Sequence, residues 1–409
     1  NEDKGISMQM GFETPFDTFT DVTVGYSKAD KTRDSDIRRF TYLQQGSVNK
    51  IRDLLSNPDL GKIINAETIA PDGFQLLEVT RPTDNYNASR VVDSAFIEAD
   101  IEIGDSWRVL AGVRKEEALQ NVNTFNLFSQ DDDVIVSTME NSDLFPTITG
   151  TWVLDQWDMQ LRSSYSETTS RPDFRELSPA AFTHPVTGQD IVGNPDLKVA
   201  YIKNYDLRWE WYYSSTESLS VGLFYKEFDS PIEAVIMPGT EGLRTFVNAA
   251  TAYTQGVEVD VNHNLEFINE RFADFFVATN VTLIESEVTI TPEQSGTITN
   301  SQRPLQGQAD YIVNFQLGYD DGDNQKGSLV YHMTGPKIRE VGVLMAPDVI
   351  DQKFGSLDAT YIHSFGQNTE LTLKVKNLLN TRQETTQGGF DINSFNDGTS
   401  GSLGLSYEF

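Results

Sequence analysis

The chain has 409 residues, with 61 acidic and 31 basic side chains, a net charge of −30 and no cysteine. Such a balance would repel a phosphate backbone, which excludes nucleic-acid binding, and the lack of cysteine excludes disulfide and thiolate chemistry. Aromatic residues make up 11% of the chain, which argues against disorder. The mean hydropathy is −0.38, and no run approaches the 18 apolar residues of a membrane helix. A spanning β-strand shows lipid only every second residue, so these values remain compatible with a transmembrane sheet.

Strict alternation of apolar and polar residues recurs along nearly the whole chain. In residues 204–211 the odd positions are Tyr, Leu, Trp and Trp, whereas the even positions are Asn, Asp, Arg and Glu. Successive side chains of a strand point to opposite sides, so this pattern predicts strands with one apolar and one polar face. In chain order we predict fifteen strands, at residues 5–13, 19–28, 91–103, 107–120, 144–154, 157–168, 202–213, 218–228, 251–265, 274–287, 304–319, 327–340, 354–365, 369–381 and 398–409.

The connections between these predicted strands alternate strictly between short and long. Connections of 2 to 8 residues take turns with connections of 13 to 62 residues. An up-and-down membrane barrel has short turns at one end and long loops at the other, whereas a β-sandwich has no reason to keep this order. Most strands have ten or more residues, enough to cross roughly 25 Å of hydrocarbon at a tilt of about 40°. The sequence therefore predicts an all-β, antiparallel transmembrane barrel.

Aromatic residues and one long connection add further expectations. Aromatic side chains near strand ends predict interfacial girdles, with ordinary core aromatics as the alternative; they are Trp107, Trp152, Trp157, Trp211, Tyr212, Tyr213 and Phe267. The connection 29–90 is predicted to carry a helix at Asn49–Leu55, with Ser47 as its cap. A long loop with its own structure serves as a lid or ligand contact, or as passive cover, and the sequence leaves both open.

No residue pattern indicates a metal or cofactor site. The four histidines, at 184, 263, 332 and 363, do not pair at metal-ligand spacing. By the alternation, His263 and His363 are predicted to face lipid near short turns. The acidic runs Asp131–Asp133 and Asp320–Asn324 do not fit an EF-hand, so we interpret them as solvated loop carboxylates. The alternative is a divalent ion that links them to lipopolysaccharide phosphate.

The sequence also predicts no enzyme and no catalytic residues. The carboxylate pairs Glu98/Asp100 and Glu258/Asp260 each share a face, as in a glycosidase, but they lie within regular strands. We therefore predict that they line a barrel lumen, opposite Arg108, Arg114, Arg162 and Arg208 on other strands. Hydrolase, P-loop and dinucleotide-binding motifs are missing from the sequence.

Several segments together resemble TonB-dependent receptors of the bacterial outer membrane. The last strand, Ser402–Phe409, resembles the C-terminal signature that the outer-membrane assembly machinery reads, and Asn377–Leu379 is similar to the family's segment before its last loop. The segments Ser170–Leu177 and Gly193–Leu197, followed by Asn204–Leu207, also resemble this family. The resemblance covers roughly residues 1–409, most specifically 160–265 and 365–409.

The resemblance implies a 22-stranded barrel with an N-terminal plug, of which residues 1–409 would be the C-terminal portion, without the plug, its TonB box and about seven strands. It implies a Gram-negative outer-membrane location and energised uptake of a scarce nutrient such as a siderophore, cobalamin or an oligosaccharide. It also implies the TonB complex as a partner through the missing plug segment, lipopolysaccharide and outer-membrane lipid, a small ligand at the extracellular loops, and a surface lipoprotein.

The main alternative to uptake is a passive pore or surface-binding barrel without energy coupling, and a further alternative is a soluble carbohydrate-binding protein. Ligand-binding residues remain unassigned. Arg171, Phe174 and Arg175 lie where a predicted strand leaves the membrane, and we favour loop scaffolding over ligand contact for them. The loop aromatics Phe128, Phe182 and Phe390 are too scattered to indicate a sugar site.

Overall fold

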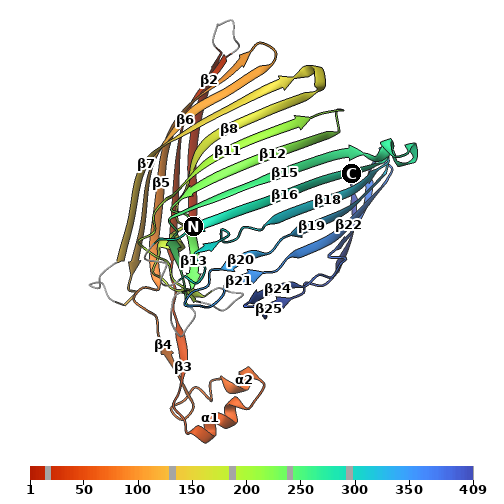
Figure 1. Cartoon of the computed structure of the whole chain (residues 1–409). Coiled ribbons are helices and arrows are strands. Elements are labelled where there is room, and N and C mark those ends of the chain that lie inside the picture. The colour runs from red at the N-terminus through yellow and green to blue at the C-terminus, as the bar shows by residue number, and fades with distance from the viewer. Residues whose placement is uncertain (14–19, 129–134, 184–189, 237–242, 292–297, 409) are drawn as a thin grey trace.

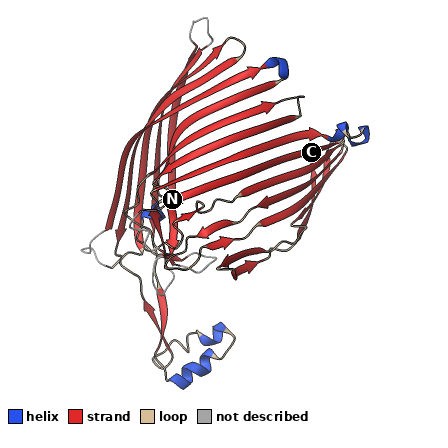
Figure 2. Ribbon diagram, in the orientation of Figure 1, coloured by secondary structure: helices blue, strands red, loops and turns tan. Residues whose placement is uncertain are grey.

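The computed structural model describes residues 1–13, 20–128, 135–183, 190–236, 243–291 and 298–408. One long antiparallel sheet dominates it (Figures 1 and 2). Its strands follow chain order, so all fifteen predicted strands are present and the all-β class is confirmed. They are β1 (Glu2–Glu13), β2 (Thr20–Ser35), β5 (Asn85–Ile103), β6 (Trp107–Phe125), β7 (Ile135–Leu154), β8 (Met159–Ser170), β11 (Ala200–Trp211), β12 (Ser218–Asp229), β15 (Thr251–Asn264), β16 (Phe275–Thr289), β18 (Tyr311–Asp320), β19 (Gln325–Thr334), β22 (Phe354–Phe365), β23 (Thr369–Lys376) and β26 (Ser400–Tyr407).

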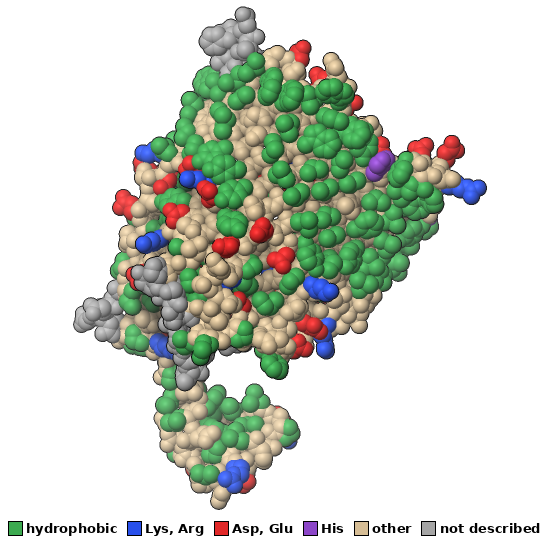
Figure 3. Space-filling model, in the orientation of Figure 1, with side chains coloured by type: hydrophobic (Ala, Val, Ile, Leu, Met, Phe, Trp, Pro, Cys, Tyr) green, Lys and Arg blue, Asp and Glu red, His purple; other side chains and the backbone are tan. Residues whose placement is uncertain are grey.

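The sheet has two chemically distinct faces. The outer face, as we use the term, carries Leu207, Leu223, Val257 and Leu283, which lie in one cross-strand row. The inner face carries the alternate residues, including Arg208 and Asp260. Figure 3 shows hydrophobic side chains gathered over the strands in the right half of the view, with charged side chains mainly toward its margins. No helix among the described residues is long and apolar enough to span a membrane.

Four strands near the N-terminus are longer than predicted. β2 continues to Ser35, β5 begins at Asn85 and β7 begins at Ile135, so the connection between β6 and β7 covers only residues 126–134. This connection is therefore much shorter than predicted, but the predicted alternation of short and long connections holds, because the flanking turns 104–106 and 155–158 are shorter still. Beyond the membrane both faces of a strand meet water, so the apolar–polar alternation that revealed the other strands is lost.

Other predicted boundaries were wrong for local reasons. The segment predicted at 327–340 divides into β19 and β20 (Lys337–Glu340) around Pro336, which has no backbone N–H to donate to a ladder. The strand predicted at 369–381 ends at Lys376 because Asn377 and Asn380 have φ values of 52° and 50°, in the left-handed region. The strand predicted from residue 304 begins at Tyr311, and Gln302–Arg303 forms the short strand β17 beside β16.

The long connections form a layer of small sheets at one end of the large sheet, which we call the long-loop end (Figure 1). An isolated bridge between Val235 and Val341 joins the two small sheets. One sheet contains β13 (Ile232–Ile236), β14 (Arg244–Asn248), β10 (Asp190–Ile191) and β9 (Phe182–Thr183). The other contains β20, β21 (Val349–Asp351), β24 (Gln383–Gln387) and β25 (Phe390–Phe395).

A separate arm projects from the long-loop end (Figures 1 and 2). It consists of the hairpin β3 (Phe40–Gln44) and β4 (Phe74–Glu78), which carries α1 (Val48–Leu55) and α2 (Leu60–Ile63). The predicted helix at Asn49–Leu55 is thus confirmed. Ser47 is its N-cap residue, although its side chain makes no capping hydrogen bond.

Candidate functional site

A row of polar side chains crosses the inner face from β8 to β19. Gln160, Glu210, Ser220, Asp260, Asn280, Asn314 and His332 are direct cross-strand neighbours in that order. Most adjacent members are hydrogen-bonded: Ser220 Oγ lies 3.0 Å from Asp260 Oδ2, Asn280 Nδ2 2.6 Å from Asp260 Oδ1, and His332 Nδ1 2.7 Å from Asn314 Oδ1. We call these seven residues the inner polar row.

Arg208 lies beside this row and donates hydrogen bonds to three of its members. Its Nε donates to Glu210 Oε1 at 3.0 Å, and its Nη2 donates to Asp260 Oδ2 at 2.9 Å and to Ser220 Oγ at 2.7 Å. Nearer the N-terminus, Arg108 Nε donates to Asp100 Oδ1 at 2.8 Å. Two of the predicted carboxylates therefore contact two of the predicted arginines: Asp100 and Arg108 lie on the neighbouring strands β5 and β6, whereas Arg208 on β11 reaches across β12 to Asp260 on β15.

The other predicted wall residues have different partners. Arg162 lies 3.9 Å from Glu210, and Arg114 Nε donates to Glu116 at 2.7 Å. Glu98 and Glu258 share the inner face with Asp100 and Asp260 but form no ion pair with any described residue. The inner face thus carries many polar and charged side chains, several of them paired within the wall, together with apolar ones such as Phe96, Phe224 and Phe276.

On the outer face, a tyrosine row marks a boundary near the long-loop end. Tyr165, Tyr205 and Tyr225 are direct neighbours on β8, β11 and β12, with ring centroids 5.0 and 6.0 Å apart. Two residues farther toward that end, the same strands carry Glu167, Lys203 and Glu227 side by side. The order apolar, tyrosine, charged is that of an interface between lipid and water.

Aromatic side chains mark the opposite boundary, at the short turns. Trp107 and Trp152 stack with centroids 5.4 Å apart. His263 lies between Tyr213 and Phe267, at 5.1 and 4.7 Å. On β11, Lys203 and Trp211 are eight residues apart, which corresponds to roughly 26 Å of strand, or about 20 Å along the membrane normal at a tilt of about 40°. The apolar part of the outer face thus lies between the two aromatic boundaries.

The two predicted lipid-facing histidines lie within this aromatic belt. Besides its ring contacts, His263 has its Nδ1 2.7 Å from Glu217 Oε1. His363 packs against Tyr361 and Phe365, with centroids 6.5 and 4.3 Å away. His332 lies on the inner face instead, and His184 is outside the described residues.

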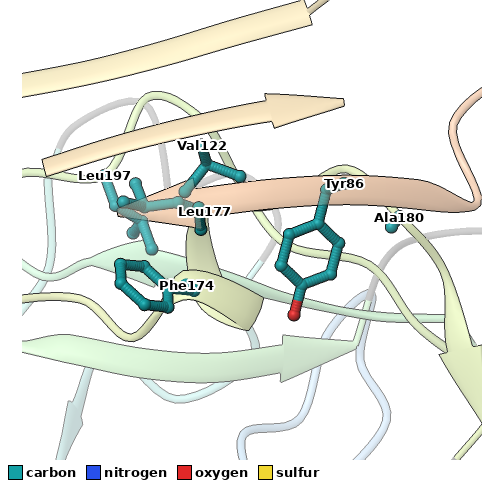
Figure 4. Packing of buried hydrophobic residues seen from close by; sticks show 7 residues of the cluster. Tyr86, Val122, Phe174, Leu177, Ala180 and Leu197 are labelled. Atoms are coloured by element: carbon teal, nitrogen blue, oxygen red, sulfur yellow. The ribbon is translucent and has the colours of Figure 1, made fainter. Parts of the chain in front are cut away.

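The loop between β8 and β11 folds back onto the inner face. Its short helix α3 (Phe174–Leu177) inserts Phe174 and Leu177, which are 2% and 0% exposed, against Tyr86 and Val122 of β5 and β6 (Figure 4). Gln120 Nε2, also on the inner face, donates to Pro172 O at 2.8 Å. Because the loop contacts strands far from its own, it narrows the entrance to the inner face.

The three loop residues singled out in the sequence have different environments. Phe174 belongs to this buried cluster, and Arg171 Nη2 lies 3.0 Å from Glu116, with both side chains largely buried. Those contacts are structural, as expected for scaffolding. Arg175 is exposed, and its guanidinium lies 4.9 Å from the ring of Phe182. The other loop aromatics, Phe128 and Phe390, are 64% and 78% exposed.

α3 begins with a capping box. The Asp173 carboxylate accepts from Arg175 N at 3.0 Å, and the Glu176 carboxylate accepts from Asp173 N at 2.8 Å. Burial opposes ionisation of Asp173, but the hydrogen bond from Arg175 N and the charge of Arg33 outweigh it, so its pKa is lowered. Burial raises the pKa of Glu176. The two carboxyl groups of one cap therefore have pKa values shifted in opposite directions.

The carboxylates of the acidic turn Asp320–Asn324, predicted to be solvated, accept hydrogen bonds and form an ion pair within or beside the turn itself. Asp321 Oδ1 accepts from Asp323 N, Asn324 N and Gln325 N at 3.1, 2.9 and 2.9 Å, and Asp320 pairs with Lys326 at 3.0 Å. The hydrogen bond from Gln325 N is the main cause of the lowered pKa of Asp321. The run Asp131–Asp133 lies outside the described residues. Among the residues that are described, no group of three or more His, Asp or Glu is placed to hold a metal ion.

Comparison with known proteins decides the family. A family model described as a TonB dependent receptor-like β-barrel matches residues 5–378. The chain belongs to the TonB-dependent receptor barrels. Barrels of this family lie in the outer membrane and serve receptors and transporters rather than enzymes, so the outer face is the lipid face, the inner face lines the lumen and the long-loop end is extracellular.

Solved structures show the same fold at low sequence identity. The siderophore receptor PirA from Acinetobacter baumannii has a TM-score of 0.62 and 14% identity, and covers 100% of this chain. The ferric enterobactin receptor PfeA from Pseudomonas aeruginosa, as its Q482A mutant, has a TM-score of 0.63 and 13% identity, and covers 100% of this chain. The ferric-catecholate import receptor Fiu from K12 E. coli has a TM-score of 0.64 and 13% identity, and also covers 100% of this chain. This TonB-dependent receptor barrel spans 55%, 54% and 55% of those three chains. No curated protein was found to match the sequence.

Proposed function

We propose that this chain forms the lumen wall and extracellular loop layer of a TonB-dependent importer that takes up a scarce nutrient. The observation that carries the proposal is the inner polar row, whose members satisfy one another across seven strands. A wall of this kind lines a water-compatible passage rather than a dry protein core. The loop that folds inward through α3 supports a restricted entrance for a small ligand.

In this mechanism the extracellular loops capture the ligand, and a plug closes the lumen until the TonB complex, acting through the plug, opens a path. The residues of this chain bind and orient the ligand at the entrance and keep the wall polar. The three structural neighbours are named as a siderophore receptor, a ferric enterobactin receptor and a ferric-catecholate import receptor, which makes a siderophore the first ligand to test. Cobalamin and oligosaccharides are the next.

The outer face supports the remaining partners. The tyrosine row and the charged row above it fit the contact with lipopolysaccharide and other outer-membrane lipid. The projecting arm carries exposed apolar side chains, including Val48 at 73% and Leu60 at 69%, which a surface lipoprotein partner would cover.

The test is energy-dependent uptake. Cells that express the receptor carrying this chain, and matched cells without TonB, are given radiolabelled iron with a panel of siderophores, labelled cobalamin and labelled oligosaccharides. We expect accumulation of one compound that requires both the receptor and TonB. Accumulation that requires the receptor but not TonB would instead establish the passive pore, and surface retention without accumulation would establish the binding barrel.

A further inference from the structure

A polar cavity of about 470 Å³ lies at the extracellular end of the inner face. Its lining includes Arg33, Asp34, Ser35, Tyr86, Asp173 and Arg175. Ser35 on β2 and Tyr86 on β5 are direct cross-strand partners, and Asp173 and Arg175 belong to the loop that folds inward through α3. The cavity thus lies between the barrel wall and this loop, and its volume is in the range of small-molecule sites.

Positive charge gathers around this cavity, although the chain has a net charge of −30. Arg33 and Arg175 line it, and Lys31 and Arg90, which are direct partners on β2 and β5, lie on the same inner face just below. The guanidinium groups of Arg33 and Arg90 lie 5.4 and 6.0 Å from the ring of Phe174, which fixes their positions. Among the described residues, Lys31, Arg90 and Arg175 have no ion-pair partner.

The carboxylates near the cavity neutralise only part of this charge. Asp173 lies 2.8 Å from Arg33 Nη1, and Asp34 is exposed on the cavity's border. The Glu176 carboxyl is engaged by the backbone N–H of Asp173, at 2.8 Å, and burial raises its pKa. The four cations Lys31, Arg33, Arg90 and Arg175 therefore outnumber the three carboxylates Asp34, Asp173 and Glu176, and Asp173 is already paired with Arg33.

Tyr86 adds a hydrogen-bond donor without an acceptor. The residue is 3% exposed, and its hydroxyl lies beside the Arg33 guanidinium but has no hydrogen-bond partner of normal geometry among the described residues. Figure 4 shows the hydroxyl at the far end of the ring from the β5 ribbon. A buried donor left unpaired costs about 1–3 kcal/mol. An acceptor atom in the cavity would remove that cost.

We propose that this cavity binds an anionic group of the imported nutrient, of the carboxylate class. Arg175 and Arg33 supply charge-assisted hydrogen bonds in the planar geometry that suits a carboxylate, and the Tyr86 hydroxyl supplies a third donor. The inference rests on the proposed import function and narrows its substrate to anionic compounds. A neutral oligosaccharide would leave the arginine charges uncompensated at the entrance.

The test is a calorimetric titration of the purified receptor carrying this chain with citrate as the carboxylate probe and maltotriose as the neutral probe. The main variant is Arg175→Gln, because this side chain is exposed and free of ion pairs, and its capping hydrogen bond uses the backbone N–H. Lys198→Gln is the matched control, since Lys198 is an exposed cation of the same loop that does not line the cavity.

We expect citrate to bind, with an affinity that falls as salt rises from about 0.05 to about 0.5 M. Arg175→Gln should weaken binding at least fivefold, Tyr86→Phe about threefold, and Lys198→Gln less than twofold. Maltotriose should not bind. The assignment is overturned if citrate does not bind the unaltered receptor, if Arg175→Gln binds it equally well, or if maltotriose binds more tightly.

Failure of this inference is distinguishable from failure of the import function. Uptake that requires TonB but is unaffected by Arg175→Gln would overturn the anion site and leave the importer intact. Uptake independent of TonB would overturn the importer, while the citrate titration would still decide whether the cavity binds a carboxylate.

Discussion

Arg303 and Glu233 form a two-pronged ion pair in the extracellular loop layer, with Nη1···Oε1 at 2.8 Å and Nη2···Oε2 at 2.6 Å, and each side chain is only 2% exposed. The pair joins β17 to β13. Beside it, Gln306 accepts from Ala234 N and donates to Ala234 O and Arg339 O. Three long loops are thereby held together at one point.

Removing one partner of this pair should loosen the layer. Glu233→Gln leaves the Arg303 charge buried and uncompensated, and such a loss costs about 3–5 kcal/mol. We expect hydrogen-exchange protection of the β13 and β14 amides to fall by a factor of about 100 or more. Asp320→Asn is the control, because its pair with Lys326 is exposed and is worth about 1 kcal/mol or less. Equal effects of the two substitutions would contradict the structural role of the buried pair.

Two adjacent residues of β15 test which face meets lipid. Val259 lies on the outer face and Glu258 on the inner face. Val259→Lys should cost about 2–4 kcal/mol, because a lysine near the bilayer midplane loses its water, and the amount of folded barrel in outer membranes should drop. Glu258→Lys should assemble normally. Heat-modifiable mobility on gels measures the folded fraction, and the opposite ranking would reverse the face assignment.

Three phenylalanines of the inner face lie over glycines of a neighbouring strand. A Cβ at Gly318 would lie 2.1 Å from the Phe276 ring, and the same arrangement joins Gly256 to Phe224 and Gly25 to Phe96. Gly318→Ala should therefore destabilise the barrel by about 1–3 kcal/mol through overpacking. Gly150→Ala, which meets nothing within 4 Å, should change the unfolding free energy far less. Urea unfolding in lipid vesicles measures both, and a neutral Gly318→Ala would mean that the ring moves aside freely.

The two capping carboxyl groups of α3 should respond to pH in opposite directions. The pKa of Asp173 is lowered on folding, so its contribution to stability is present above its unfolded pKa of about 3.9 and is lost as pH falls through the folded value. The pKa of Glu176 is raised, so its ionisation costs stability above its unfolded pKa of about 4.3.

At pH 7, Asp173→Asn should therefore lower the exchange protection of residues 174–178, and Glu176→Gln should keep or raise it, since Gln still accepts the Asp173 N–H. Both differences from the unaltered chain should shrink below about pH 4. Protection factors corrected for intrinsic exchange provide the measurement. A Glu176→Gln variant that loses protection at pH 7 would show that the carboxylate is needed in its ionised form.

The sequence predicted the membrane-spanning part of the fold because lipid and water impose a two-residue period on every strand there. It did not predict the extensions of β2, β5, β6 and β7, where water on both faces removes that period. The side of the strand on which each residue falls predicted that Asp100 and Asp260 share a face with arginines of other strands, but the pairs Arg108–Asp100 and Arg208–Asp260 themselves were not predicted.

The cavity could not be predicted from the sequence, for a different reason. Arg33 and Tyr86 fall within the stretch predicted as one long connection, and Arg175 is about 90 residues farther along, so only the inward fold of the α3 loop brings them together. No local sequence pattern predicts such a long-range contact. The capping box Asp173–Glu176 was readable in the sequence as a helix start, but its position against β5 and β6 was not.

The inner polar row affects the movement of any ligand or plug through the lumen. The row is already hydrogen-bonded within the wall, through Arg208, Asp260, Asn280 and Asn314. When a neighbouring body moves away, few of these groups lose a partner. Water can wet such a surface with little penalty either before or after the movement. A lining of this kind contributes little to the free-energy barrier for movement through the lumen, so the resistance to opening should arise elsewhere in the receptor.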